Sequence, residues 1–157
     1  MGIVNVVGSS IAREVHAGIY NHAGPEIAVA STKAFVSQIA VLILAAVYFG
    51  RMRNFLNQES ASDLLKELLA LPSKARKILA SDRKIRKLAK SYSKYNNFLY
   101  LGRKYNWPVS LEGALKLKEI SYVHAEGYPA GEMKHGPIAL VDSDFPAMVV
   151  VLKDSVY

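Results

Sequence analysis

The segment LEGALKLKEISY, residues 111–122, decides how the rest of the sequence is interpreted. At 100° per residue, its apolar and charged positions separate onto different faces of one helix. Glu112, Lys116 and Glu119 follow one another at steps of four and three residues, so they share a narrow stripe among leucines. The sequence therefore predicts a helix from about Ser110 that carries a carboxylate, an ammonium and a second carboxylate in a row.

This row has two interpretations. Partly buried carboxylates beside an ammonium are typical of acid–base catalysts. The same spacing is more often that of a solvated helix with two ordinary ion pairs, which is the simpler interpretation. The spacing alone leaves both open, and the choice depends on the segments around it.

The next segment, residues 125–137 (AEGYPAGEMKHGP), has three glycines and two prolines. Such a composition predicts a long irregular loop, and loops of this kind are disproportionately functional. His135 is the best single candidate there for proton transfer near neutral pH, although a structural histidine is an equal alternative. The other histidines lack metal-site spacing, so we expect no metal.

The composition limits the classes of protein that the chain represents. It has 157 residues, of which 51% are hydrophobic and 21% charged, which suits one domain or parts of two and excludes disorder as the main state. The absence of cysteine excludes disulfide scaffolds and thiol nucleophiles.

The first third of the chain predicts a buried strand and a long helix. Four of residues 3–7 (IVNVV) are β-branched and apolar, which predicts a strand. Residues 8–10 (GSS) break this pattern, and they could cap a helix or cradle a phosphate. Ser31 and Thr32 could cap a helix that runs to about Phe55. Its apolar run, Ala34 to Gly50, is shorter than the roughly 20 residues that span a bilayer, so we expect no membrane association. We expect a helix that is covered on all sides, either within a large core or at a subunit interface.

The remainder predicts a helical connector and a second strand–helix unit. Helical spacing continues over residues 59–79, with a break or the first turn of a new helix expected at Pro72. Residues 74–94 are rich in lysine and arginine, where most of the net charge of +7 lies. A solvated basic helix is the simpler interpretation, and a nucleic-acid surface is the alternative. Strands are expected at 97–101 and 146–152, which gives an α/β fold with parallel-sheet character.

Three segments together, residues 29–35 (VASTKAF), 111–122 and 132–137 (EMKHGP), closely resemble the isomerase part of the glutamine–fructose-6-phosphate aminotransferase family, the glucosamine-6-phosphate synthases. The resemblance covers essentially the whole chain. It implies sugar isomerase (SIS) domains, each a parallel sheet flanked by helices. The implied organisation is the end of a first SIS domain (1–58), a helical connector with the start of a second (59–94), and the beginning of the second (95–157).

The resemblance also implies roles for individual residues. Glu119 would be the base that moves a proton between C1 and C2 of fructose-6-phosphate, and Lys116 would stabilise negative charge on the reacting oxygens. His135 would open the sugar ring of a neighbouring subunit in a homodimer. Val29, Ala30 and Ser31 resemble positions that contact the sugar.

The resemblance further implies what the chain lacks. The family's phosphate-binding loop, its glutaminase domain and its C-terminal lysine have no counterpart here. We therefore expect a cytoplasmic fragment that requires no cofactor, binds fructose-6-phosphate or glucosamine-6-phosphate, and makes no glucosamine-6-phosphate from glutamine by itself. A non-catalytic SIS module that binds phosphosugars, and a related amino-sugar-phosphate deglycase or isomerase, are the alternatives.

Overall fold

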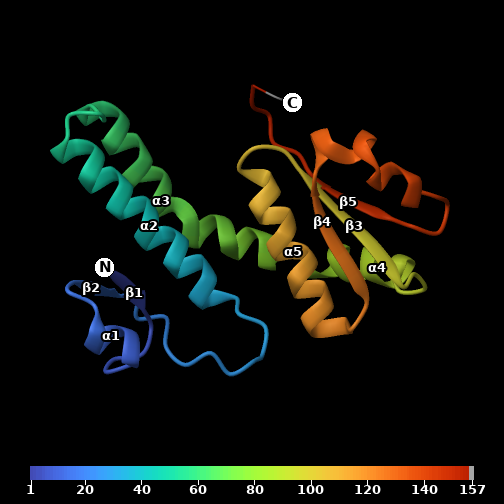
Figure 1. The fold of residues 1–157 in the computed structure, drawn as a ribbon, viewed down its shortest axis with the longest axis horizontal. Helices are drawn as coiled ribbons and strands as arrows, with labels where there is room; N and C mark the ends of the chain where they lie inside the picture. The colour runs from blue at the N-terminus through green and yellow to red at the C-terminus, as the bar shows by residue number, and fades with distance from the viewer. Residues whose placement is uncertain (156–157) are drawn as a thin grey trace. The chain divides into compact units, whose positions relative to one another are not determined.

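The computed structural model describes residues 1–155. The chain consists of two compact units, which divide after Asp82 and are described separately below. Figure 1 shows the elements of both units. The first unit contains the strands β1 (Gly2–Val4) and β2 (Gly18–Tyr20) and the helices α1 (Ser10–Glu14), α2 (Lys33–Met52) and α3 (Gln58–Leu79). The helix α4 (Asp82–Tyr92) leads into the second unit, which contains β3 (Asn97–Gly102), α5 (Asn106–Ser121), β4 (His124–Pro129), the 3-10 helices η1 (Ala130–His135) and η2 (Pro137–Leu140), and β5 (Ala147–Val150).

The first unit is built on two short parallel strands. β1 pairs with β2 in register Gly2↔Gly18, and α1 connects them. Ser9 is the N-cap of α1, where its Oγ accepts a hydrogen bond from the Ala12 amide. The GSS segment therefore acts as a helix cap here, the simpler of its two predicted roles. The strand β2 was missed, because three residues carry too little periodicity to identify.

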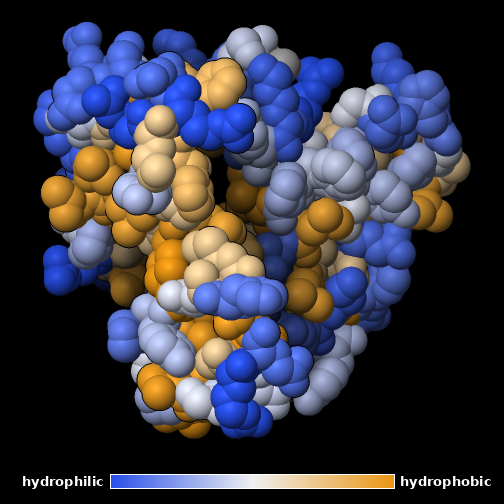
Figure 2. Space-filling model, turned by 60° about the vertical axis from the view of Figure 1, so that its left-hand side comes forward, coloured by the Kyte–Doolittle hydropathy of each residue, from blue (hydrophilic) through white to orange (hydrophobic). Residues whose placement is uncertain are grey.

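The long apolar helix α2 is present, but the structure does not cover it. Val47 is its one fully buried residue among those described, although α2 also packs against α3. Apolar side chains at the surface are orange in Figure 2. A core within this chain therefore does not cover α2, and cover by a neighbouring subunit stays a prediction. By length and composition alone α2 could also cross a membrane, a test that the core helix of a globular protein passes too.

The connector is more regular than its composition indicates. α3 continues through Pro72 without a break, so the expected interruption is wrong. Asn57 caps its N-terminus by accepting a hydrogen bond from the Ser60 amide at 2.8 Å. The basic residues of α3 and α4 are largely exposed to solvent, as a solvated basic face requires.

The second unit is a three-stranded parallel sheet in the order β4-β3-β5. β3 is the central strand, and Leu99 within it is completely buried. α5 lies across β4 and β3 (Figure 1) and packs through Ser110 and Ala114, both of which are buried. The sheet includes β4, which the sequence analysis assigned to an irregular loop.

Two glycines allow α5 to approach the sheet. A Cβ on Gly127 in β4 would lie 2.8 Å from Cδ2 of Leu111, and one on Gly102 in β3 would lie 2.2 Å from the backbone oxygen of Asn106. Real Cβ atoms do not tolerate such distances, so only glycine fits at both positions. Gly127, one of the glycines that indicated a loop in the sequence, instead marks a close helix–sheet contact.

Candidate functional site

The charged row on α5 forms as the helical spacing predicts. Lys116 donates a hydrogen bond to Oε2 of Glu119, and its Nζ lies 3.5 Å from Oε1 of Glu112. All three side chains are only 21–25% exposed. Both ion pairs of the simpler interpretation are present, but three quarters of each side chain is removed from water, so the row is not fully solvated.

The two carboxylates change the acid–base properties of the lysine. The pKa of Lys116 is raised, first by its hydrogen bond to Glu119 and then by the charge of Glu112, against the opposing effect of burial. Lys116 is therefore an ammonium at neutral pH. The Glu119 carboxylate therefore lies directly beside the Lys116 ammonium. A carboxylate can transfer a proton, and an adjacent ammonium can stabilise an oxyanion that develops during the reaction.

His135 is the last residue of η1 and is exposed. Within residues 1–155 it makes no hydrogen bond or ion pair. Gly136 follows with φ at +140°, a conformation that L side chains rarely adopt, and it separates η1 from η2. The imidazole is therefore presented to solvent at a fixed turn, where it is free to contact a bound molecule or another subunit.

Val29, Ala30 and Ser31 belong to the first unit, in the segment that precedes α2. Val29 is 91% exposed, whereas Ala30 is 5% exposed. The structure thus places these three residues together in one segment, and it places the α5 row and His135 in the second unit.

The cap of α2 comes from a residue that the sequence analysis did not select. The Glu26 carboxylate accepts hydrogen bonds from the backbone amides of Thr32 at 2.8 Å and Ala34 at 3.3 Å. These bonds, led by that of Thr32, lower the pKa of Glu26. Thr32 is the N-cap residue, as the sequence predicts, but its side chain makes no capping hydrogen bond.

A second polar row lies on β4. The phenol of Tyr128 donates a hydrogen bond to Glu126, which raises the pKa of Tyr128, and Nε2 of His124 lies 3.5 Å from Oε1 of Glu126. These residues alternate along the strand and share its face. The alternation was the available signal, and the glycine and proline content of the segment concealed it.

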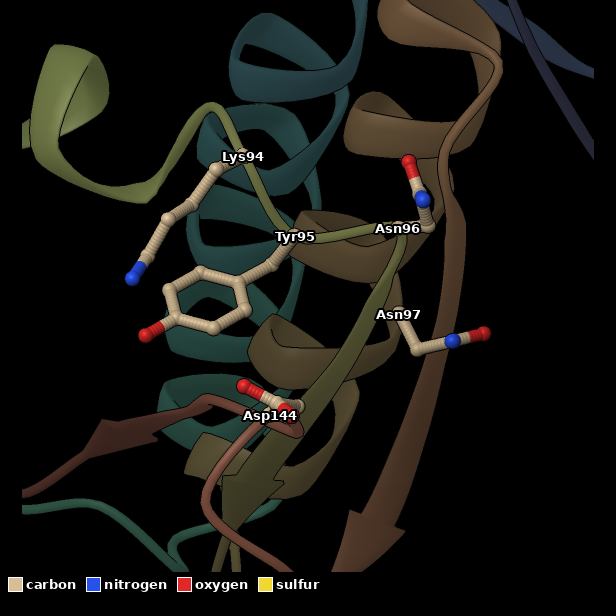
Figure 3. A pocket seen from close by; sticks show the side chains of 5 residues that line it. All are labelled: Lys94, Tyr95, Asn96, Asn97 and Asp144. Carbon is tan, nitrogen blue, oxygen red and sulfur yellow. The ribbon is translucent and has the colours of Figure 1, made fainter.

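Two hollows occur in the second unit. One of about 220 Å³ lies at the amino end of β3, where Lys94, Tyr95, Asn97 and Asp144 surround it (Figure 3). Lys94 lies over the Tyr95 ring at 4.8 Å, so its cation is already engaged. No cluster of three metal-ligating side chains occurs within the described chain, residues 1–155.

Comparison with known proteins relates this geometry to enzymes. Residues 91–156 match the SIS domain family. The chain is 54% identical over 157 residues to glutamine–fructose-6-phosphate aminotransferase (isomerizing) of Chlorobaculum tepidum, and 49% identical over 156 residues to that of Bacteroides thetaiotaomicron. These alignments cover 100% and 99% of this chain and 25% of each relative, so the chain spans about a quarter of their length.

The fold agrees with the sequence comparison. The C-terminal domain of glucosamine-fructose-6-phosphate aminotransferase from Francisella tularensis superposes with a TM-score of 0.95 at 40% identity. The match covers 98% of this chain and 43% of that structure.

Proposed function

We propose that this chain is a part of the SIS region of the glutamine–fructose-6-phosphate aminotransferase family and that it supplies the proton-transfer residues of the isomerase site. The observation that carries the proposal is the partly buried row of Glu112, Lys116 and Glu119. The substrate under this proposal is fructose-6-phosphate, which the complete enzyme converts to glucosamine-6-phosphate with glutamine as the nitrogen donor.

Each residue has a distinct role in the proposed reaction. Glu119 takes a proton from one of the carbons C1 and C2 and returns it to the other. Lys116, fixed as an ammonium, offsets the negative charge that develops on the neighbouring oxygen, an effect that is strong where water is excluded. Because Lys116 binds Glu119 in the free protein, the arriving sugar oxygen competes for the ammonium and releases the carboxylate to act as a base.

The remaining contacts complete the proposal. His135 opens the sugar ring, and its exposure suits a role toward a neighbouring subunit of a homodimer. Val29, Ala30 and Ser31 contact the sugar, from a segment that the Glu26 hydrogen bonds hold at the start of α2. The proposed organisation remains 1–58, 59–94 and 95–157, in a cytoplasmic protein that needs no cofactor and has no specific nucleic-acid partner.

A chimera tests these roles in a complete enzyme. The corresponding quarter of the Bacteroides thetaiotaomicron aminotransferase is replaced by this chain, and glucosamine-6-phosphate formation is measured. We expect an active chimera, in which Glu119→Gln lowers kcat by about 100-fold or more while fructose-6-phosphate still binds, since loss of a general base typically costs 10²–10⁴-fold. Lys118→Met, on the same helix, is the matched control and should retain activity.

Two results would contradict the proposal. A folded chimera that binds the sugar but has no activity before any substitution would favour a non-catalytic phosphosugar-binding module. A Glu119→Gln chimera as active as its parent would remove Glu119 from the reaction.

A further inference from the structure

The second hollow of the second unit lies at the carboxyl end of its sheet and is separate from the charged row on α5. It measures about 110 Å³ and is lined by the ends of β3 and β5, by Ala130, and by the polar residues Arg103, Asn106 and Asp154. Asn106 precedes Lys116 by ten residues of one helix, which corresponds to about 15 Å along its axis. The two sites are therefore distinct.

Its location in the fold is one where parallel sheets bind ligands. All three strands run in the same direction, so their carboxyl ends meet at one edge. Open α/β sheets bind small molecules in the crevice at this edge. The N-terminus of α5 also lies here, and the partial positive charge of a helix N-terminus favours an anion.

Asn106 is one of the residues that line the hollow. The residue is only 7% exposed, and its side-chain amide makes no hydrogen bond with any other residue in the described part of the chain. The amide atoms are not fully enclosed by protein, so they can donate to a molecule bound in the hollow. Gly102 causes this burial, because the absence of its side chain lets the first turn of α5 approach the end of β3.

Arg103 supplies a cation at the rim. Its Nη2 atom lies 3.9 Å from the position that a Cβ on Gly131 would occupy, so the guanidinium extends from the end of β3 toward the start of η1. Within residues 1–155 the guanidinium makes no hydrogen bond or ion pair. A guanidinium with unused donors is suited to bidentate binding of phosphate.

We propose that this hollow is a second binding site for the phosphate group of a small polyhydroxyl ligand, a sugar phosphate. Arg103 and the Asn106 amide donate hydrogen bonds to the phosphate oxygens, and the Asp154 carboxylate accepts one from a ligand hydroxyl. A cavity of this size holds a phosphate group, and the sugar lies toward solvent. The proposal rests on this geometry alone and does not require the proposed isomerase function.

Amide NMR on the 157-residue chain tests the site directly. Inorganic phosphate, fructose-6-phosphate and unphosphorylated fructose are titrated in separate experiments. We expect saturable shifts at residues 102–106 and 149–154 with both phosphates, tighter binding of fructose-6-phosphate, and no saturable shifts with fructose. If inorganic phosphate binds as tightly as the sugar phosphate, the ligand is free phosphate and the sugar assignment is wrong.

Variants distinguish phosphate binding at this site from nonspecific attraction of anions to a basic protein. Arg103→Met should weaken phosphate binding by about 10-fold or more, the effect of losing a hydrogen bond to a charged group. Lys118→Met removes the same charge about 18 Å from Asn106 along α5 and should leave binding unchanged. Equal weakening by both variants, or no saturable shift at these residues in the parent chain, would overturn the proposal.

The test also distinguishes this site from the isomerase row. Glu119→Gln should leave the shifts at residues 102–106 intact, whatever it does to catalysis in the chimera. Shifts that instead centre on Lys116 and disappear with Glu119→Gln would overturn the second site and leave the isomerase proposal standing.

Discussion

Lys116 connects the charge of α5 to the stability of the protein. Its pKa is raised by Glu119 and Glu112, so folding favours its protonated form. The resulting stabilisation is complete below the unfolded pKa of about 10.4 and is lost as the pH rises through the higher folded value. The contribution of the charged row to the free energy of unfolding is therefore constant near neutral pH and falls at strongly alkaline pH.

A lysine variant should show this dependence. Between pH 9.5 and 11.5 the free energy of unfolding of the parent chain should fall more steeply with pH than that of Lys116→Met. Urea unfolding at several pH values measures both slopes, with Lys118→Met as the control. Identical slopes for the parent and Lys116→Met would show that the lysine is not coupled to the carboxylates in solution.

The charged row was predictable from the sequence, whereas its burial was not. The order of Glu112, Lys116 and Glu119 follows from the period of an α-helix alone. Their 21–25% exposure depends on packing in the folded unit, which helical spacing does not encode. The role of Glu26 was equally inaccessible, because its partner Ala34 lies eight residues further along and the intervening loop sets the distance.

At the scale of elements, the start of α2 depends on Glu26. Because hydrogen bonds from the backbone lower its pKa, the charged form is favoured by folding. This stabilisation is present above the unfolded pKa of about 4.3 and is lost as the pH falls through the folded value.

Removing that carboxylate should therefore weaken α2. We expect Glu26→Gln to lower the Tm at pH 7 and to reduce the loss of stability between pH 5 and pH 3, because the cap then no longer titrates. Circular dichroism during heating at both ends of this range measures the effect, and Glu59→Gln in α3 is a control. An unchanged Tm at pH 7 would contradict the capping role.

The contact between β3 and α5 depends on Gly102. In Gly102→Ala the new methyl group would lie 2.2 Å from the Asn106 oxygen, so the helix must move and stability should fall by about 1–3 kcal/mol. Gly131→Ala meets only the Arg103 guanidinium at 3.9 Å and should change stability little. The urea unfolding midpoints of the two variants test this difference. Equal midpoints would mean that the first turn of α5 moves away from the new methyl group without loss of stability.

The strand β4 shows why elements rich in glycine are difficult to identify from sequence. Residues 124–129 (HAEGYP) lack the β-branched alternation that marks an isolated strand. The segment is extended because β3 offers a parallel partner, with Phe98 opposite Ala125 and Tyr100 opposite Gly127. Pairing with β3 thus makes this segment a strand. By contrast, β3 has an apolar run of its own, and its predicted end lies within one residue of the observed end.

At the scale of the whole molecule, the distribution of apolar surface stands out. Large side chains of α2 are well exposed, among them Leu42 at 51% and Tyr48 at 60%. In the second unit, β4 and β5 each have one edge unpaired among the described residues. Exposed apolar surface and open parallel edges both favour association between chains.

We therefore expect the purified chain to associate as its concentration rises. Sedimentation velocity from low to high micromolar concentrations should show an increasing weight-average coefficient, and replacing Leu42 and Tyr48 with glutamine should reduce the increase. A single monomer species in the parent chain over the whole range would contradict this expectation.

The order of the strands also constrains how the second unit folds during synthesis on the ribosome. Its central strand pairs with β4, about 25 residues later, and with β5, about 50 residues later, through partners such as Leu99 and Ala147. A nascent chain can form the β3–α5–β4 unit early, but one edge of β3 stays unpaired until residue 150 has left the ribosome. During that interval Leu99 is exposed on a half-finished sheet, so slow translation of residues 130–146 would lengthen the period in which a chaperone, or a neighbouring nascent chain, competes with β5 for the same edge.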